Sequence, residues 1–197
     1  MRTTNLSTIS RRLEGRSSAC MLTHPVLDRP AILDMTKEEY EGRKRQSPLC
    51  YGELSSLAQE IQDYYFSVAN SHLGHLTVKN MTPSGSIQSI ERNNGANWVG
   101  LAKYSTYEDC PPTVVLSYSH LVGDAQYGVL TETIPHEVAH LVWNLLRVDL
   151  TYEDQVNLGF RTRTGRYSSH GKVWKDIFKK ITGWKKINNR YFGQVTR

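Results

Sequence analysis

Cysteine and long apolar runs are scarce in this chain of 197 residues. Its three cysteines, Cys20, Cys50 and Cys110, are far apart and form no C-x-x-C pair. An odd number of distant cysteines fits reduced thiols better than a disulfide framework or a cysteine-ligated zinc site. No run of about 18 apolar residues occurs, so neither a transmembrane helix nor a membrane partner is expected. The residues that follow the N-terminal arginines contain no apolar stretch, which argues against a secretory signal.

Several other signatures are missing, and the length suggests a single domain with extensions. No P-loop, dinucleotide fingerprint, internal repeat or Ser/His/Asp nucleophile pattern is found. Residues 1–48 are predicted to be an N-terminal extension, either flexible or a leader, and residues 49–197 to form the domain. The first 20 residues contain four arginines and one acid, Glu14. This composition resembles a mitochondrial transit peptide, so a mitochondrial location stands beside a cytoplasmic, nucleoid or nuclear one.

The strongest motif is H-E-x-x-H at residues 136–140, within an apolar stretch of helical character. Residues four apart share one face of a helix, so His136 and His140 can both reach one zinc ion. Glu137 is offset by one position, where its carboxylate can act as a general base towards water instead of binding the metal. The opposite face is apolar and is predicted to pack into the core; it comprises Val138, Leu141, Val142 and Leu145.

A third zinc ligand would define the class of site. The long metzincin motif requires glycine and histidine where this chain has Trp143 and Leu146, so that class is excluded. Glu153 and Asp154 form one candidate pair of ligands, because a carboxylate completes the site in other zincins. His120 follows a predicted strand and could approach the site, although a structural role is favoured for it.

Downstream, His170-Gly171-Lys172-Val173-Trp174 follows the helical motif at a distance of about thirty residues. An H-E-x-x-H helix followed by H-G-x-x-W resembles the SprT-like metallopeptidases, which include the Spartan proteases. The resemblance covers roughly residues 50–185. It implies that His170 is the third zinc ligand and that the substrates are proteins on or near DNA. Many SprT-like proteins also carry a cysteine-rich zinc ribbon, and this chain has none.

The expected fold is α+β, as in a zincin-like metallopeptidase domain. A long amphipathic helix is predicted over about 53–71, followed by a small antiparallel or mixed sheet in which Asn94-Gly95 signals a hairpin. Pro135 is tolerated only in a first helical turn, so the motif helix should start near Glu132 or Thr133, or kink there. A final helix should begin with Ser168 or Ser169 as its cap and end at Gly183. The predicted strands are 76–79, 86–92, 98–104 and 113–118, and the third of these is the candidate strand bordering the cleft.

Positive charge is concentrated at the C-terminal end. Residues 161–197 contain five arginines and six lysines against one acid, a net charge of +10, whereas the rest of the chain carries −5. Basic residues interleaved with aromatic ones suit single-stranded or damaged DNA, by phosphate pairing and base stacking. A solvated basic face with packed aromatic rings is the alternative interpretation. The candidate contacts are Lys179, Lys180, Trp184, Lys185, Lys186 and Arg190.

These observations favour a zinc-dependent metalloendopeptidase of SprT-like type, with Glu137 as its base and protein as its substrate. Tyr167 is a candidate for stabilising the oxyanion, on sequence proximity alone. The alternative is a nucleic-acid-binding protein whose zinc is structural and which cleaves nothing. A virus- or plasmid-encoded protease acting on host or particle proteins is a third interpretation.

Overall fold

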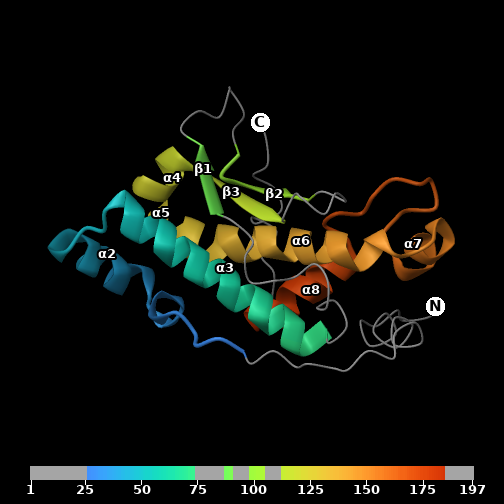
Figure 1. Ribbon diagram of the computed structural model, residues 1–197, viewed down its shortest axis with the longest axis horizontal. Coiled ribbons are helices and arrows are strands. Elements are labelled where there is room, and N and C mark those ends of the chain that lie inside the picture. Colours follow the sequence, from blue (N-terminus) through green and yellow to red (C-terminus); the bar gives the residue numbers. More distant parts are fainter. Residues whose placement is uncertain (1–25, 74–86, 91–97, 105–111, 185–197) are drawn as a thin grey trace.

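The computed structural model describes residues 26–73, 87–90, 98–104 and 112–184, which form a mixed α+β structure that is mostly helical (Figure 1). In chain order its elements are the 3-10 helix η1 (Ala31–Asp34), α2 (Lys37–Gln46), α3 (Tyr51–Leu73), β1 (Ile87–Ile90), β2 (Gly100–Lys103), β3 (Thr113–Ser117), α4 (Tyr118–Val122), α5 (Gln126–Gly128), the π-helix η2 (Val129–Thr133), α6 (Ile134–Val148), α7 (Tyr152–Leu158) and α8 (Lys172–Thr182). None of the helices in these ranges is long and apolar enough to cross a bilayer.

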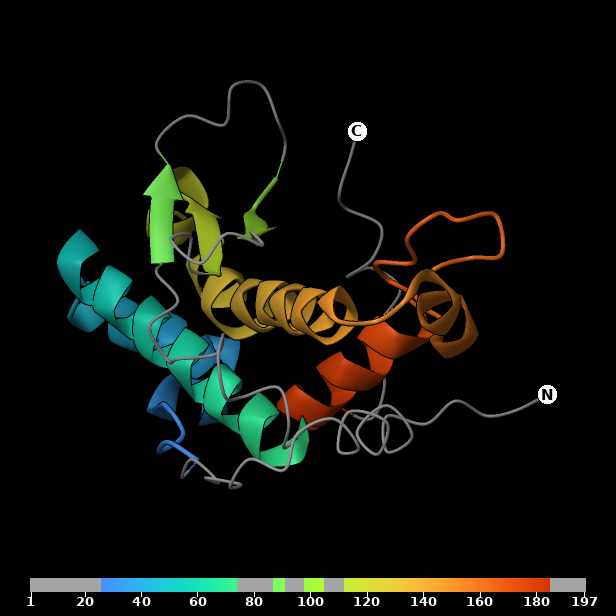
Figure 2. The ribbon, with the colours of Figure 1, turned by 45° about the vertical axis from the view of Figure 1, so that its right-hand side comes forward.

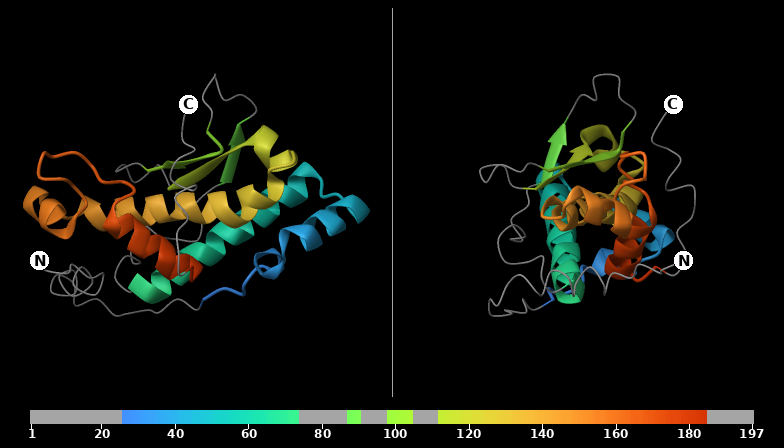
Figure 3. Two further views of the ribbon diagram at one scale, coloured as in Figure 1. Left: turned by 180° about the vertical axis from the view of Figure 1, so that it is seen from behind. Right: turned by 90° about the vertical axis from the view of Figure 1, so that its right-hand side faces the viewer.

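Helix α6, which carries the H-E-x-x-H motif, lies at the centre of the structure. The sheet lies on one side of α6 and α8 on the other, and α3 crosses it (Figures 1 and 3). The predicted apolar face is confirmed, because Val138, Leu141, Val142 and Leu145 are all buried. Burying a side chain of this size contributes about 1.5–3 kcal/mol, so this face anchors the motif in the core.

The start of α6 follows the prediction from Pro135. The helix begins at Ile134, and Pro135 occupies its first turn, where the missing N–H is not required. The π-helix η2 precedes α6, and its last residue, Thr133, already has helical dihedral angles, with φ of −71° and ψ of −45°. The chain therefore enters α6 through a wider helical turn.

The sheet is mixed, and the predicted hairpin is wrong. Strand β3 is central, pairs in parallel with β1 and antiparallel with β2, and separates the two. Asn94-Gly95 lies outside the described residues, as does the predicted strand 76–79. All five residues of β3 are buried, as expected for a central strand. Local turn signals such as Asn94-Gly95 cannot specify which strand takes this position. Strand β2 is left at an edge of the sheet, facing α6.

The predicted long helix is confirmed as α3, which extends from Tyr51 to Leu73. The charged segment before it forms α2, whose start is stabilised by a capping box between Thr36 and Glu39. Most of α2 is exposed, but Tyr40 is buried and its hydroxyl donates to Gln126 Oε1 at 2.8 Å. Residues from the predicted N-terminal extension thus contribute to the core.

Helix α8 lies alongside α6 and extends towards the end of α3 (Figure 2). Its predicted apolar stripe is confirmed, because Trp174, Ile177, Phe178 and Ile181 are buried, and Gly183 ends it with a φ of 71°. The predicted serine cap is wrong: Gly171 is the N-cap residue and its backbone N–H donates to Ser168 O at 2.9 Å. Residues 168–171 therefore form a turn before the helix.

Candidate metal centre

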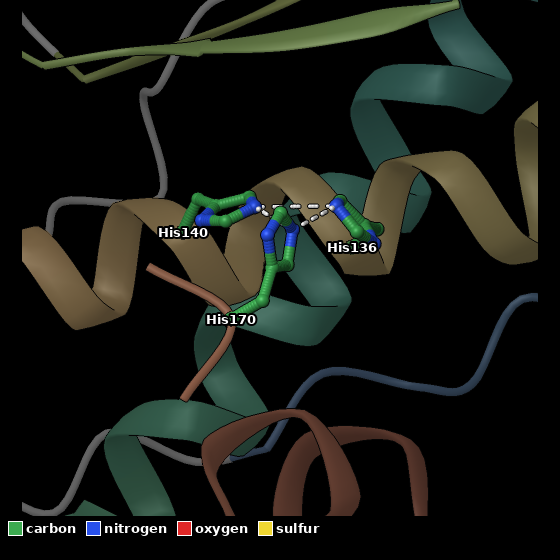
Figure 4. Close-up of side chains that lie close together, drawn as sticks. All are labelled: His136, His140 and His170. Carbon is green, nitrogen blue, oxygen red and sulfur yellow. Dashed lines mark hydrogen bonds between the residues drawn. The ribbon is translucent and has the colours of Figure 1, made fainter. Parts of the chain in front are cut away.

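Three imidazoles converge on one point beside α6 (Figure 4). His136 and His140 project from consecutive turns of α6, and His170 projects from the turn that precedes α8. The Nε2 atom of His140 lies 3.2 Å from that of His136 and 3.0 Å from that of His170, and the remaining separation is 3.2 Å. These three histidines lie close enough together to bind a metal ion.

The separations fit a tetrahedral metal. Zinc–nitrogen bonds of about 2.0–2.1 Å at tetrahedral angles place two ligand nitrogens roughly 3.3 Å apart, close to the spacing of the three Nε2 atoms. No other His, Cys, Asp or Glu of the described residues joins this cluster. Three imidazoles would leave one tetrahedral position for water or substrate, which is the arrangement of a catalytic zinc site.

Burial keeps the cluster in the form that binds metal. It lowers the pKa of His136 to about 4, with a further contribution from His170, and lowers the pKa of His140 to about 2, with contributions from His136 and His170. The pKa of His170 is also lowered, first by burial and then by Lys175. Metal ligation requires neutral imidazole, so protons would compete weakly for this site at neutral pH.

Trp174 forms the apolar support of the cluster. Its ring is fully buried and its centroid lies 4.8 Å from that of His136, 5.2 Å from that of His140 and 5.0 Å from that of His170. Phe178 stacks on Trp174, with ring centroids 5.1 Å apart and an interplanar angle of 12°. The sequence pattern predicted Trp174 to be core, and the structure adds that it contacts all three histidines of the cluster.

Gly171 explains how His170 reaches the site. A Cβ atom at Gly171 would lie 2.2 Å from Ser168 Oγ and 3.0 Å from Ser168 O, so any larger residue would force Ser168 to shift. The turn then presents the imidazole of His170 towards α6 (Figure 4). The close packing of this turn thus helps to position the third candidate ligand.

Glu137 lies next to the cluster and is buried, with 8% of its surface exposed. Burial raises the pKa of Glu137 to about 8, and a hydrogen bond from the backbone N–H of Ala102 acts in the opposite direction. A cation bound by the histidines would also favour the ionised carboxylate. Because the carboxylate is held by β2, it is positioned beside the cluster rather than within it.

Gly100 allows β2 to approach Glu137. A Cβ atom at this position would lie 2.5 Å from Thr133 Cγ2 and 3.2 Å from Glu137 Oε1. The predicted cleft-bordering strand, 98–104, therefore runs against the candidate base, although the sequence did not identify the roles of Gly100 and Ala102. A glycine in a predicted strand was the available signal, because it marks a close approach of the backbone.

The other candidate ligands lie elsewhere. His120, on α4, has its Nδ1 within 2.7 Å of Ser117 Oγ and is not part of the cluster. Glu153 and Asp154 lie in the first turn of α7, where Asp154 interacts with the capping residue Thr151. Tyr167 is about half exposed, and its hydroxyl accepts a hydrogen bond from Arg161 Nη2.

Only part of the candidate DNA-contact set is described. Lys179 and Lys180 are exposed on the last turns of α8. Trp184 is half-buried, and its ring packs edge-on against Phe178 with centroids 5.4 Å apart. Lys185, Lys186 and Arg190 lie outside the described residues.

Comparison of this chain with protein-family profiles, with curated proteins and with solved structures found no match. The functional argument therefore rests on the geometry of the site and on the motifs themselves.

Proposed function

We propose that this protein is a zinc-dependent metalloendopeptidase with a zincin-like site of SprT-like type. The observation that carries the proposal is the convergence of three Nε2 atoms beside a buried carboxylate that shares a helix with two of them. Histidine-rich sets with one open position suit catalytic zinc. Strand β2 supports the same function, because its edge position beside Glu137 provides a place for an extended polypeptide.

The residues divide the work of peptide hydrolysis between them. A zinc ion held by His136, His140 and His170 would supply Lewis acidity, activating water and polarising the scissile carbonyl. Glu137 accepts the proton of the attacking water and delivers it to the leaving amine. The backbone N–H of Ala102 and the close contact of Gly100 keep that carboxylate in place. Trp174 closes the apolar side of the ligand set.

The alternative is a nucleic-acid-binding protein with a structural zinc. Structural zinc sites are closed by four protein ligands, and the described residues contribute three. Cleavage of proteins near single-stranded or damaged DNA belongs to the proposal through the sequence resemblance and the basic C-terminal segment. The exposed Lys179 and Lys180 are the described residues that support it.

The test combines metal analysis with proteolysis of an unstructured protein. Zinc-loaded protein should cleave the substrate, a chelator should abolish cleavage and added zinc should restore it. Glu137→Gln should retain zinc and the fold but lose about 10²–10⁴-fold in rate, the usual contribution of a general base. Glu132→Gln, the same substitution five residues earlier on η2, is the matched control and should retain activity. Undiminished cleavage by Glu137→Gln, or none by the zinc-loaded wild type, contradicts the proposal.

A further inference from the structure

Two arginines lie over one tyrosine ring near the metal centre. The guanidinium carbon of Arg147 is 4.3 Å from the ring centroid of Tyr167, and that of Arg161 is 3.7 Å from it. Arg147 also lies 5.1 Å from the ring of Trp143. Cation–π contacts stabilise guanidinium groups without neutralising their charge.

Neither charge is neutralised by a carboxylate of the described residues. Arg161 donates hydrogen bonds to Gln155 Oε1 at 2.7 Å, to Gly165 O at 2.8 Å and to the Tyr167 hydroxyl. Arg147 donates through Nε and Nη2 to Asn144 Oδ1, at 3.0 and 2.8 Å. The Nη1 group of Arg147 donates to no acceptor within the described ranges, so this half-buried cation retains capacity for a ligand anion.

Arg147 lies on the same face of α6 as the metal ligands. It follows His136 by eleven residues and His140 by seven, which at about 100° per residue places all three within roughly 40° of one another. At about 1.5 Å per residue, Arg147 lies roughly 10 Å beyond His140 along the helix. Asn144 connects the two, because its Nδ2 donates to His140 O at 3.0 Å and its Oδ1 accepts from Arg147.

Strand β2 runs in the same direction as α6, from Glu137 towards Arg147. Gly100 lies against Glu137, and Tyr104, directly after the strand, is within electrostatic reach of Arg147 and Asp149. An extended polypeptide advances about 3.3 Å per residue, so roughly three residues span the distance from His140 to Arg147. A segment antiparallel to β2, the pairing that β2 already makes with β3, would place its N-terminal side towards Arg147.

We infer that Arg147, supported by Tyr167 and Arg161, is a specificity-determining residue that binds an acidic side chain about three residues N-terminal to the scissile bond. This inference rests on the proposed peptidase function and assigns its substrate class, acidic polypeptide segments. Guanidinium and carboxylate form strong charge-assisted hydrogen bonds. A nucleic acid is disfavoured at this surface because residues 147–167 contain three carboxylates beside four arginines. The carboxylates interrupt the positive charge, so the surface suits a single anionic side chain better than a continuous string of phosphates.

The test uses three quenched peptides that carry Glu, Gln or Lys at the third position before a cleavage site mapped by mass spectrometry. The wild type should cleave the Glu peptide with about tenfold higher kcat/KM, the factor expected for one hydrogen bond to a charged group. Arg147→Gln should bring the ratio of kcat/KM between the Glu and Gln peptides close to one, and Arg147→Lys should retain part of the preference for Glu. Arg147→Glu should instead prefer the Lys peptide. Arg163→Gln is the matched control, because this exposed arginine makes no hydrogen bond, ion pair or ring contact with a described residue. Its loss should leave the ratio of kcat/KM between the Glu and Gln peptides unchanged.

Zinc content and melting temperature, measured for each variant, show whether the substitution disturbs Asn144 and His140. A Glu preference that survives in folded Arg147→Gln, or that falls equally in Arg163→Gln, overturns the inference while the peptidase proposal stands. If the wild type cleaves no peptide, the proposed function fails, and binding of the same peptides to zinc-loaded Glu137→Gln still tests Arg147 by fluorescence anisotropy. In this binding experiment, equal affinity for the Glu and Gln peptides overturns the inference. Arg147-dependent binding of a short single-stranded oligonucleotide in place of the Glu peptide overturns it as well.

Discussion

The Nε2 atoms of His140 and His170 lie 3.0 Å apart although thirty residues separate them along the chain. The intervening segment leaves α6, forms α7 and returns through the bridge between Arg161 and Tyr167 before reaching the turn that carries His170. The packing of α8 against α6 maintains this proximity. The candidate metal centre therefore depends on tertiary structure as much as on the motif.

His170→Ala should lose tight zinc binding, because a two-histidine site lacks the third Nε2 atom. Zinc at one hundred times its dissociation constant stabilises a folded protein by about 2.7 kcal/mol, and this gain should disappear in the variant. His120→Ala is the control, since His120 contacts Ser117 outside the cluster. The measurements are zinc content and the melting temperature with and without zinc. Full zinc occupancy in His170→Ala would show that another residue completes the site.

Gly100→Ala should impair catalysis without removing zinc. Its Cβ atom would lie 3.0 Å from Glu137 Cγ and 2.5 Å from Thr133 Cγ2, so either the carboxylate or β2 must move. A misplacement of about 1 Å at a catalytic group costs on the order of a hundredfold in rate. The kcat of the variant should fall by about this factor while its zinc content is retained.

The control for Gly100→Ala is Gly42→Ala on α2, where no atom lies within 4 Å of the added Cβ. There the substitution should be neutral or should stabilise the helix by about 0.5–1 kcal/mol. Full activity of Gly100→Ala would show that the approach of β2 does not position Glu137.

Tyr40→Phe should change the dependence of stability on alkaline pH. Burial, with a smaller contribution from Glu41, raises the pKa of Tyr40 from 10.0 to about 12. A raised pKa means that the folded state binds the proton more tightly, so its contribution to stability is complete below pH 10 and is lost as the pH rises through about 12. The free energy of unfolding of the variant, measured by denaturant titration, should therefore fall less steeply over this range.

At pH 7 the free energy of unfolding of Tyr40→Phe should be about 1–2 kcal/mol lower than that of the wild type, because Gln126 Oε1 is left buried without the hydroxyl that donates to it. Tyr118→Phe is the control, since the Tyr118 hydroxyl bonds to no residue in the described part of the chain. If the free energy of unfolding depends on alkaline pH in the same way for Tyr40→Phe and the wild type, Tyr40 does not contribute to that dependence.

Trp184→Ala separates the two interpretations of the C-terminal aromatic residues. The ring packs edge-on against Phe178 at the end of α8, so its removal should lower the free energy of unfolding by about 1–3 kcal/mol. The affinity of the folded protein for single-stranded DNA, measured by fluorescence anisotropy at low salt, should remain unchanged. The opposite result, weaker DNA binding at unaltered stability, would identify Trp184 as a base-stacking residue.

The sequence by itself determined the elements whose cause is local. The spacing of His136 and His140, the offset of Glu137 and the first-turn position of Pro135 follow from helix geometry, and the apolar faces of α3, α6 and α8 follow from periodicity. The position of Gly183 at the end of α8 follows from its tolerance of positive φ.

Tertiary structure decided what depends on contacts between distant segments. Strand order could not be predicted, because Asn94-Gly95 reports only a local turn preference whereas the buried β3 takes the centre of the sheet. The contact of Gly100 with Glu137, the support of three imidazoles by Trp174 and the two guanidinium groups over Tyr167 each join residues from separate elements. Periodicity along one chain segment carries no information about which face of another segment it will meet, and packing of α6 between the sheet and α8 supplies that information.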